Sequence, residues 1–122
     1  MSRGEGAWEE WRLCGADEIA EGQVRGFELE LDGRSLRIFT ARRAGALYTY
    51  LNRCPHRGTP LDWRPDEFFD EDGRYLVCGT HGAIFQVEDG LCLAGPCAGD
   101  LLTPVETFVS AGELYARIPA RD

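Results

Sequence analysis

The sequence predicts an all-β protein of antiparallel strands, and three observations lead to this prediction. No long segment keeps the 3.6-residue apolar period of a helix. Several short segments alternate apolar and polar residues, which is typical of half-buried strands. Turns containing some of the 15 glycines separate these segments. The 122 residues suit one domain with a modest core.

The clearest element is a hairpin in the first third of the chain. Val24–Leu31 reads V-R-G-F-E-L-E-L, which alternates as one strand of a half-buried pair would. Asp32-Gly33 is typical of a two-residue hairpin turn, and Ser35–Thr40 alternates again as the returning strand. We expect four apolar side chains of this hairpin to share one core face: Leu29, Leu31, Leu36 and Ile38.

The remaining elements are expected between similar turns. One helical turn is predicted at Ala16–Gly22, with Asp17 as its N-terminal cap. Seven more strands bring the total to about nine or ten: Trp11–Cys14, Ala46–Leu51, Tyr75–Cys78, Ile84–Val87, Leu91–Leu93, Thr103–Val109 and Glu113–Ile118.

Charge and hydropathy exclude several classes of protein. The net charge of −8 and the pI near 4.7 argue against a nucleic-acid partner, because such partners require basic surfaces. No run of about 18 apolar residues is present, so we expect no membrane span. The N-terminus lacks the apolar segment of a secretory signal, and we expect a cytoplasmic protein. In that compartment cysteines more often bind metals or act in catalysis than form disulfides.

Two short motifs carry the chemistry. The first is Cys54-Pro55-His56 and the second is Cys78-Gly79-Thr80-His81, with 21 residues between them. Together they contain both histidines and two of the five cysteines. Thiolate and imidazole are ligands for zinc, copper and iron–sulfur centres. The spacing is typical of a [2Fe–2S] centre in which two histidines replace two cysteines on one iron. Zinc is the alternative, although one residue between Cys54 and His56 suits two irons better than a single tetrahedral ion.

The residues around these motifs resemble the Rieske ferredoxin family. The family pattern C-x-H-x-G-x-x-L is present at Cys54–Leu61, and C-x-x-H-G-x-x-F is present at Cys78–Phe85. Asp89-Gly90 and Gly95-Pro96 are similar to the family's third loop, which packs over the cluster. The resemblance implies that Cys54 and Cys78 bind the inner iron of one [2Fe–2S] cluster, and that His56 and His81 bind the outer iron.

The same resemblance implies a domain organisation. The fold would be an antiparallel β sandwich or barrel with a small cluster-binding subdomain. Residues 1–122 would form a single domain, with a cluster-binding part at about 52–98. This part would be inserted in a basal β domain made of residues 8–51 and 99–119.

Residues next to the ligands indicate the branch of the family. Quinol-oxidase members carry an extra cysteine in each cluster loop and form a disulfide, but Thr59 and Thr80 occupy these positions here. Those members also carry a serine and a tyrosine hydroxyl near the cluster, where this chain has Ala83 and Phe85. Hydrogen bonds to the sulfurs affect the potential, so the resemblance implies a low-potential, soluble ferredoxin.

The expected function is one-electron transfer between a reductase and a terminal oxygenase or another acceptor. These partners would dock near His56 and His81. A self-contained oxygenase would need a second iron site, usually with two further histidines, so we expect no enzymatic activity. The alternative is a small Rieske-type subunit of a multi-component oxidoreductase such as nitrite reductase. Of the other cysteines, Cys14 is expected to be structural. The alternatives for Cys92 and Cys97 are a disulfide and two thiols, and a reducing cytoplasm favours thiols.

Overall fold

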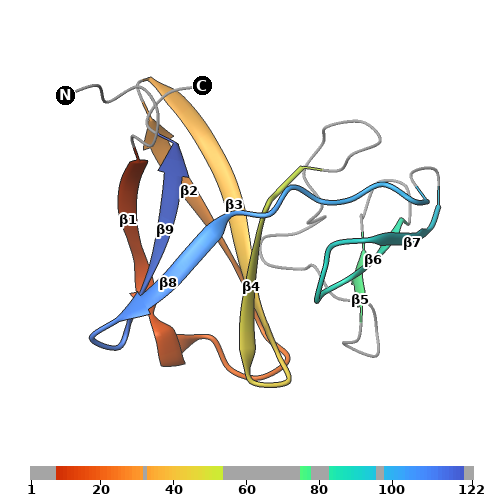
Figure 1. Cartoon of the computed structure of the whole chain (residues 1–122), viewed down its shortest axis with the longest axis horizontal. Helices are drawn as coiled ribbons and strands as arrows, with labels where there is room; N and C mark the ends of the chain where they lie inside the picture. The colour runs from red at the N-terminus through yellow and green to blue at the C-terminus, as the bar shows by residue number, and fades with distance from the viewer. Residues whose placement is uncertain (1–7, 32, 54–74, 78–82, 96–97, 120–122) are drawn as a thin grey trace. The chain divides into compact units, whose positions relative to one another are not determined.

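The computed structural model describes residues 8–31, 33–53, 75–77, 83–95 and 98–119. Within these ranges the chain forms nine strands and one short 3-10 helix (Figure 1). The strands make three antiparallel sheets of three strands, in the orders β1-β9-β8, β2-β3-β4 and β5-β6-β7. The predicted all-β class and the strand number are therefore confirmed. No helix in the described ranges is long and apolar enough to cross a membrane.

The chain divides into two compact units, and the first contains both ends of the described chain. It consists of β1 (Trp8–Gly15), η1 (Ala16–Glu18), β8 (Glu106–Ser110) and β9 (Glu113–Pro119). The central strand β9 pairs with both β1 and β8. Its buried side chains alternate along the strand, as the period of two requires: Leu114, Ala116 and Ile118.

The helical turn of the first unit is shorter than expected. It ends at Glu18, and Asp17 lies inside it instead of capping it. The Glu18 carboxylate accepts a hydrogen bond from the Gly15 N–H at 3.0 Å. Glu18 therefore satisfies one of the unpaired N–H groups at the start of the turn.

The second unit holds the other two sheets. The first of these sheets consists of β2 (Val24–Leu31), β3 (Arg34–Arg43) and β4 (Ala46–Leu51). The second consists of β5 (Tyr75–Val77), β6 (Ile84–Gln86) and β7 (Cys92–Ala94). The bounds of β2 and β4 are those that the sequence predicts.

The β2–β3 hairpin is apolar on both faces. Leu29 lies opposite Leu36, and the face they share also holds Ile38, as expected. Leu29 and Ile38 are buried and Leu36 is partly buried, whereas the side chain of Leu31 lies outside the described part of the structure. The opposite face supplies three residues to the main core of the unit: Val24, Phe39 and Ala41.

That main core joins the two sheets of the second unit. Phe39 packs against Tyr50 on β4, with 5.8 Å between ring centroids. The β5–β7 sheet and the segment after it add the rest of the buried set: Leu76, Ala83, Phe85, Val87, Cys92 and Leu102. Burial of these side chains fixes the β5–β7 sheet on the β2–β4 sheet.

Two hairpin turns place alanine in a left-handed backbone conformation. Ala44 and Gly45 connect β3 to β4 with φ values of 53° and 83°, and Ala111 and Gly112 connect β8 to β9 with 52° and 79°. Both central residues of such a two-residue turn need positive φ, which costs alanine about 1 kcal/mol.

We expect Ala111→Asn to raise the free energy of unfolding by about 0.5–1 kcal/mol, because asparagine tolerates this conformation better than alanine. Urea unfolding of the two proteins measures the difference. Ala111→Val is the opposing variant and should lower stability, since β-branched residues resist positive φ. Equal stability of all three proteins would contradict the assigned turn geometry.

Candidate metal centre

The four predicted ligands, Cys54, His56, Cys78 and His81, lie outside the described residues. The positions Thr59 and Thr80 lie outside them too. What the structure shows is the scaffold at the ends of the two motifs. The roles of the four ligands therefore remain predictions, and the question is whether this scaffold suits them.

The second motif is held at both ends by a strand pair. Cys78 directly follows Val77, the last residue of β5, and His81 comes three residues before Ile84, the first residue of β6. Val77 lies opposite Ile84 in the antiparallel ladder. The segment between them therefore begins and ends at neighbouring positions of one sheet.

The first motif starts from an anchored backbone. The Leu51 N–H, at the end of β4, donates to the Thr103 carbonyl oxygen at 2.9 Å. The Asn52 N–H donates to the Arg37 carbonyl oxygen, also at 2.9 Å, and the Asn52 side chain is buried. The Arg53 N–H donates back to the Leu51 carbonyl oxygen at 2.9 Å, so the chain turns sharply just before Cys54.

The backbone after β7 comes close to Ala83 at Gly95. This residue follows β7 and has a φ of 103°. A Cβ atom placed on Gly95 would lie 2.8 Å from the Cα and 3.1 Å from the Cβ of Ala83. Real Cβ atoms essentially never come within 3.0 Å of another heavy atom. Only glycine therefore lets the backbone after β7 approach Ala83, which lies two residues after His81.

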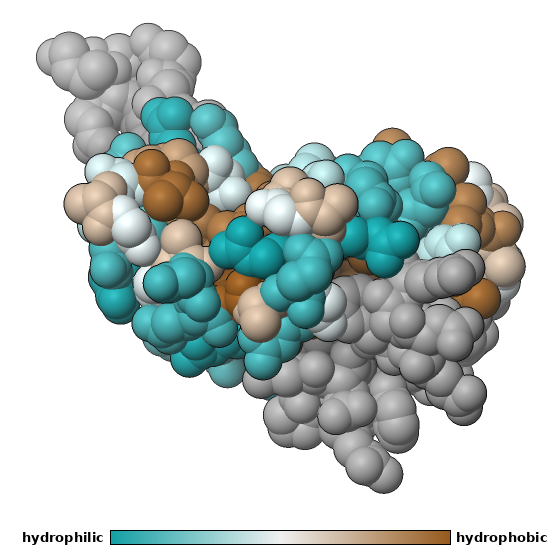
Figure 2. All heavy atoms as spheres, turned by 90° about the horizontal axis from the view of Figure 1, so that it is seen from below, coloured by the Kyte–Doolittle hydropathy of each residue, from teal (hydrophilic) through white to brown (hydrophobic). Residues whose placement is uncertain are grey.

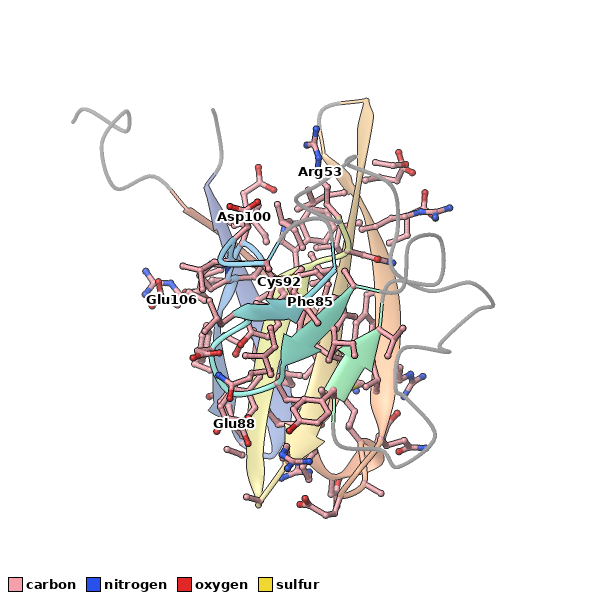
Figure 3. The ribbon with its side chains drawn as sticks, turned by 90° about the vertical axis from the view of Figure 1, so that its right-hand side faces the viewer. Arg53, Phe85, Glu88, Cys92, Asp100 and Glu106 are labelled. Carbon is pink, nitrogen blue, oxygen red and sulfur yellow. The ribbon has the colours of Figure 1, made fainter. Side chains whose placement is uncertain are left out.

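Ala83 and Phe85, the two described positions that indicate the branch of the family, are completely buried. Phe85 lies opposite Cys92 on β7, and Figure 3 shows these two side chains on adjacent strands. Cys92 is itself buried, and its thiol donates to the Ala94 carbonyl oxygen at 3.2 Å. Cys14 is buried on β1, as expected of a structural cysteine. Cys97 lies outside the described residues, so its state remains a prediction.

Sequence reasoning missed the role of Tyr50. Its hydroxyl donates to the Val87 carbonyl oxygen at 2.6 Å, which ties β4 to the turn after β6. Gly90 lies against the same ring, since a Cβ there would be 3.0 Å from Tyr50 Cε1 and 3.1 Å from Leu102 Cβ. No local sequence pattern predicts this hydrogen bond, because 37 positions separate Tyr50 from Val87.

Tyr50 should make stability depend on pH in the alkaline range. Burial, with the nearby Asp89 carboxylate, raises the pKa of Tyr50 from 10.0 to about 12. The folded chain keeps this proton where the unfolded chain loses it. The stabilisation is thus fully present below pH 10 and is lost as pH rises through about 12. A shift of this size corresponds to about 2–3 kcal/mol.

The measurement is urea unfolding across pH 9 to 12. We expect Tyr50→Phe to lose the part of the pH slope that this group contributes, and to lose about 1 kcal/mol at neutral pH with the bond to Val87. Tyr115→Phe is the matched control, because Tyr115 lies on β9 of the other unit and is not among the groups that raise the pKa of Tyr50, and this variant should keep that slope. A wild-type slope in Tyr50→Phe would show that another group titrates.

The scaffold fits a [2Fe–2S] cluster. Two thiolates and two imidazoles form the donor set of this type of cluster. The segments that contain them are flanked by strands, and Gly95 allows a third backbone segment to come close to Ala83. Backbone N–H groups brought close in this way are the donors that affect the potential of such clusters.

Comparisons with solved structures show the same fold. The reduced complex between oxygenase and ferredoxin in carbazole 1,9a-dioxygenase aligns with 93% of this chain at 21% identity and a TM-score of 0.70. This chain spans 29% of that matched chain. The complex of reduced oxygenase and oxidised ferredoxin aligns with 89% of this chain and 91% of the other, at 25% identity and a TM-score of 0.67.

A single ferredoxin gives a similar result. The ferredoxin of carbazole 1,9a-dioxygenase from Nocardioides aromaticivorans IC177 aligns with 89% of this chain and 98% of its own, at 22% identity and a TM-score of 0.62. No curated protein sequence matches the chain. A family model described as the Rieske [2Fe-2S] domain matches residues 9–109, which is most of the chain. This chain therefore belongs to the Rieske [2Fe-2S] domain family and holds one [2Fe–2S] cluster.

Proposed function

We propose that this protein is a cytoplasmic one-electron carrier, a Rieske-type ferredoxin that passes electrons from a reductase to a terminal oxygenase or another acceptor. The observation that carries the proposal is the complete set of two cysteines and two histidines in the sequence, in two segments whose described flanking residues are anchored in strands. A cluster of this kind exchanges one electron. The chain supplies binding and electrostatics for it and is not itself an enzyme.

The two pairs of ligands take different roles in this proposal. Cys54 and Cys78 bind the inner iron, and His56 and His81 bind the outer iron. Two neutral imidazoles in place of two thiolates make the cluster less negative, which raises its potential above that of an all-cysteine ferredoxin. Redox partners dock near His56 and His81, where the electron path to the outer iron is shortest.

The experiment is metal analysis followed by a redox titration of the purified protein. We expect about two irons and two acid-labile sulfides per chain, and a reversible one-electron reduction. Reduced protein should then pass its electron to an added acceptor. Zinc without sulfide would overturn the proposal, as would a cluster that cannot be reduced reversibly.

A low potential is the finer part of the proposal, and Ala83 and Phe85 support it. Both side chains are buried and neither carries a hydrogen-bond donor. Donors to the sulfurs stabilise the reduced, more negative cluster, so their absence lowers the potential. We place this centre near the low end of the Rieske range, which is about −150 to +300 mV.

Phe85→Tyr should raise the reduction potential by tens of millivolts, on the order of the effect of one hydrogen bond to sulfur. The measurement is a redox titration followed by electron paramagnetic resonance. Phe39→Tyr is the matched control, because Phe39 is also completely buried in the same core. Its potential should equal that of the wild type. Equal shifts in both variants would show a general effect of the added hydroxyl instead.

A further inference from the structure

Two of the exposed large apolar side chains lie on and just after β7. Among the described residues, Leu93 is 45% exposed, Leu101 is 58% exposed, and Val109 of the other unit is 53% exposed. Cys92 faces the core of the second unit, and a bulge in the β6–β7 pairing follows it at Leu93. Leu93 therefore leaves the inner face of the sheet and lies at the surface.

Leu101 is brought beside β7 by backbone hydrogen bonds. The Cys92 N–H donates to the Asp100 carbonyl oxygen at 2.8 Å, and the Leu102 N–H donates to the Gly90 carbonyl oxygen at 2.9 Å. These bonds place Leu91 directly opposite Leu101. Directly opposite residues of an antiparallel pair share one face, so Leu91 and Leu101 lie on the same face, and the exposed bulge residue Leu93 lies two positions from Leu91 along the chain. We name Leu91, Leu93 and Leu101 the leucine surface.

The surroundings of the leucine surface are acidic. Residues 83–104 contain three acidic residues and no arginine, lysine or histidine. The three are Glu88, Asp89 and Asp100, and all are exposed. Glu88 forms an ion pair with Arg43 on β3 at 2.8 Å, so the acidic rim is assigned to Asp89 and Asp100. Figure 3 shows Asp100 and Glu88 on opposite sides of the β6–β7 pair. Figure 2 shows hydrophobic residues at the surface at the β7 end of the molecule, next to hydrophilic ones.

Exposed leucines with acidic residues around them favour one kind of partner. Exposed apolar residues with a polar rim are typical of protein–protein contact sites. An acidic rim attracts a basic face and repels an acidic one, which steers the encounter. Leu93 also lies two residues before Gly95, which approaches Ala83 beside the second motif. A protein bound here is thus a few residues of backbone from Ala83, which follows His81 by two positions in the sequence.

We propose that the leucine surface is a docking site for a redox protein whose own contact patch has an apolar centre surrounded by arginine or lysine. The inference rests on the proposed function, since it assumes that the protein transfers electrons. Leucine contacts supply the affinity at the centre of the contact, and Asp89 and Asp100 supply the attraction at its rim.

Cytochrome c is a suitable probe, because lysines surround its exposed haem edge. Protein reduced with dithionite and freed of excess reductant is mixed with ferric cytochrome c in a stopped-flow instrument. The reduced cluster gives one electron to the ferric haem, which becomes ferrous, and the cluster returns to its oxidised state. The measured quantity is the second-order rate constant at low ionic strength.

We expect Leu93→Ser/Leu101→Ser to lower this rate constant by about fivefold or more. Val109→Ser is the matched control, because Val109 on β8 is a similarly exposed apolar side chain. Its rate constant should stay within about twofold of that of the wild type. Asp100→Asn should lower the rate constant at low salt and leave it unchanged in about 0.5 M salt, where such charges are screened. Reduction potential and iron content are measured for each variant.

The outcomes separate this inference from the proposed function. A wild-type protein without a reducible cluster would overturn both. If the wild type reduces cytochrome c and the double variant does so at the same rate, only the docking site is wrong. Should the double variant lose iron, Leu101→Ser alone decides the matter, because Leu101 is the most exposed of the leucines and lies outside the strands. An unchanged rate in that variant would overturn the docking site.

Discussion

Cys78→Ser is expected to abolish assembly of the [2Fe–2S] cluster. The variant should lose about two irons and two sulfides per chain, together with the visible colour of the protein. The physical reason is that a serine hydroxyl is a poor replacement for a thiolate, which is the ligand that iron–sulfur clusters require. Metal and sulfide analysis of the purified variant measures the loss.

Cysteines outside the two motifs provide the control for this result. Cys14→Ala removes a buried thiol of β1 that the proposed ligand set does not use, so the cluster should remain. Some stability should be lost with the buried sulfur, so unfolding and iron content are measured together. Full iron content in Cys78→Ser, or loss of iron in Cys14→Ala, would show that the ligand set is wrong.

His81→Cys tests the other kind of ligand. A thiolate in place of imidazole makes the centre more negative and changes the electronic structure of the outer iron. The electron paramagnetic resonance signal of the reduced protein should therefore shift, and the potential should fall. A spectrum identical to that of the wild type would mean that His81 does not bind the cluster.

Local patterns predicted much of the fold correctly. The alternation in Val24–Leu31 and the glycine turn that precedes Ala46–Leu51 gave the bounds of β2 and β4. The prediction that β8 begins at Thr103 was wrong, because Pro104 lacks an N–H group for a ladder. Pro104 makes only an isolated bridge with Tyr50, and the strand begins at Glu106.

Contacts between distant parts of the chain were beyond sequence reasoning. The face of β3 that carries Phe39 and Ala41 forms the main core, whereas alternation favoured the face of Ile38. Choosing between them requires knowing that β5–β7 packs on the Phe39 face. The bond from Tyr50 to Val87 and the pairing of Leu91 with Leu101 depend on the same tertiary arrangement.

The scaffold of the metal centre was likewise predictable from the sequence only in part. Alternation predicted the strands that flank the two motifs, whereas the ligand assignment rests on residue types and spacing and falls on residues outside the described ranges. The glycines of the third loop were recognised from the resemblance alone. That Gly95 is needed for its distance to Ala83 follows only from the structure.

Gly95→Ala should destabilise the folded protein by about 2–5 kcal/mol. Part of this cost is the left-handed backbone, since a φ of 103° is strained for any residue with a Cβ. The other part is steric, because the new Cβ would lie 2.8 Å from Ala83 Cα. Because Ala83 belongs to the loop that carries the second motif, we also expect faster loss of the cluster. Urea unfolding and the decay of visible absorbance measure the two effects.

Gly99→Ala is a matched control in the same region of the chain. Gly99 has a φ of 95°, close to that of Gly95, but a Cβ there would meet no atom within 4 Å. It should therefore show the backbone cost without the clash, and the difference between the two variants isolates the contact with Ala83. We expect that difference to be about 1–3 kcal/mol. Ala83→Gly should rescue Gly95→Ala only in part, because it removes the Ala83 Cβ and leaves the closer Cα in place. Equal destabilisation by Gly95→Ala and Gly99→Ala would mean that the third loop tolerates a side chain at Gly95, and that close packing of the two loops does not protect the cluster.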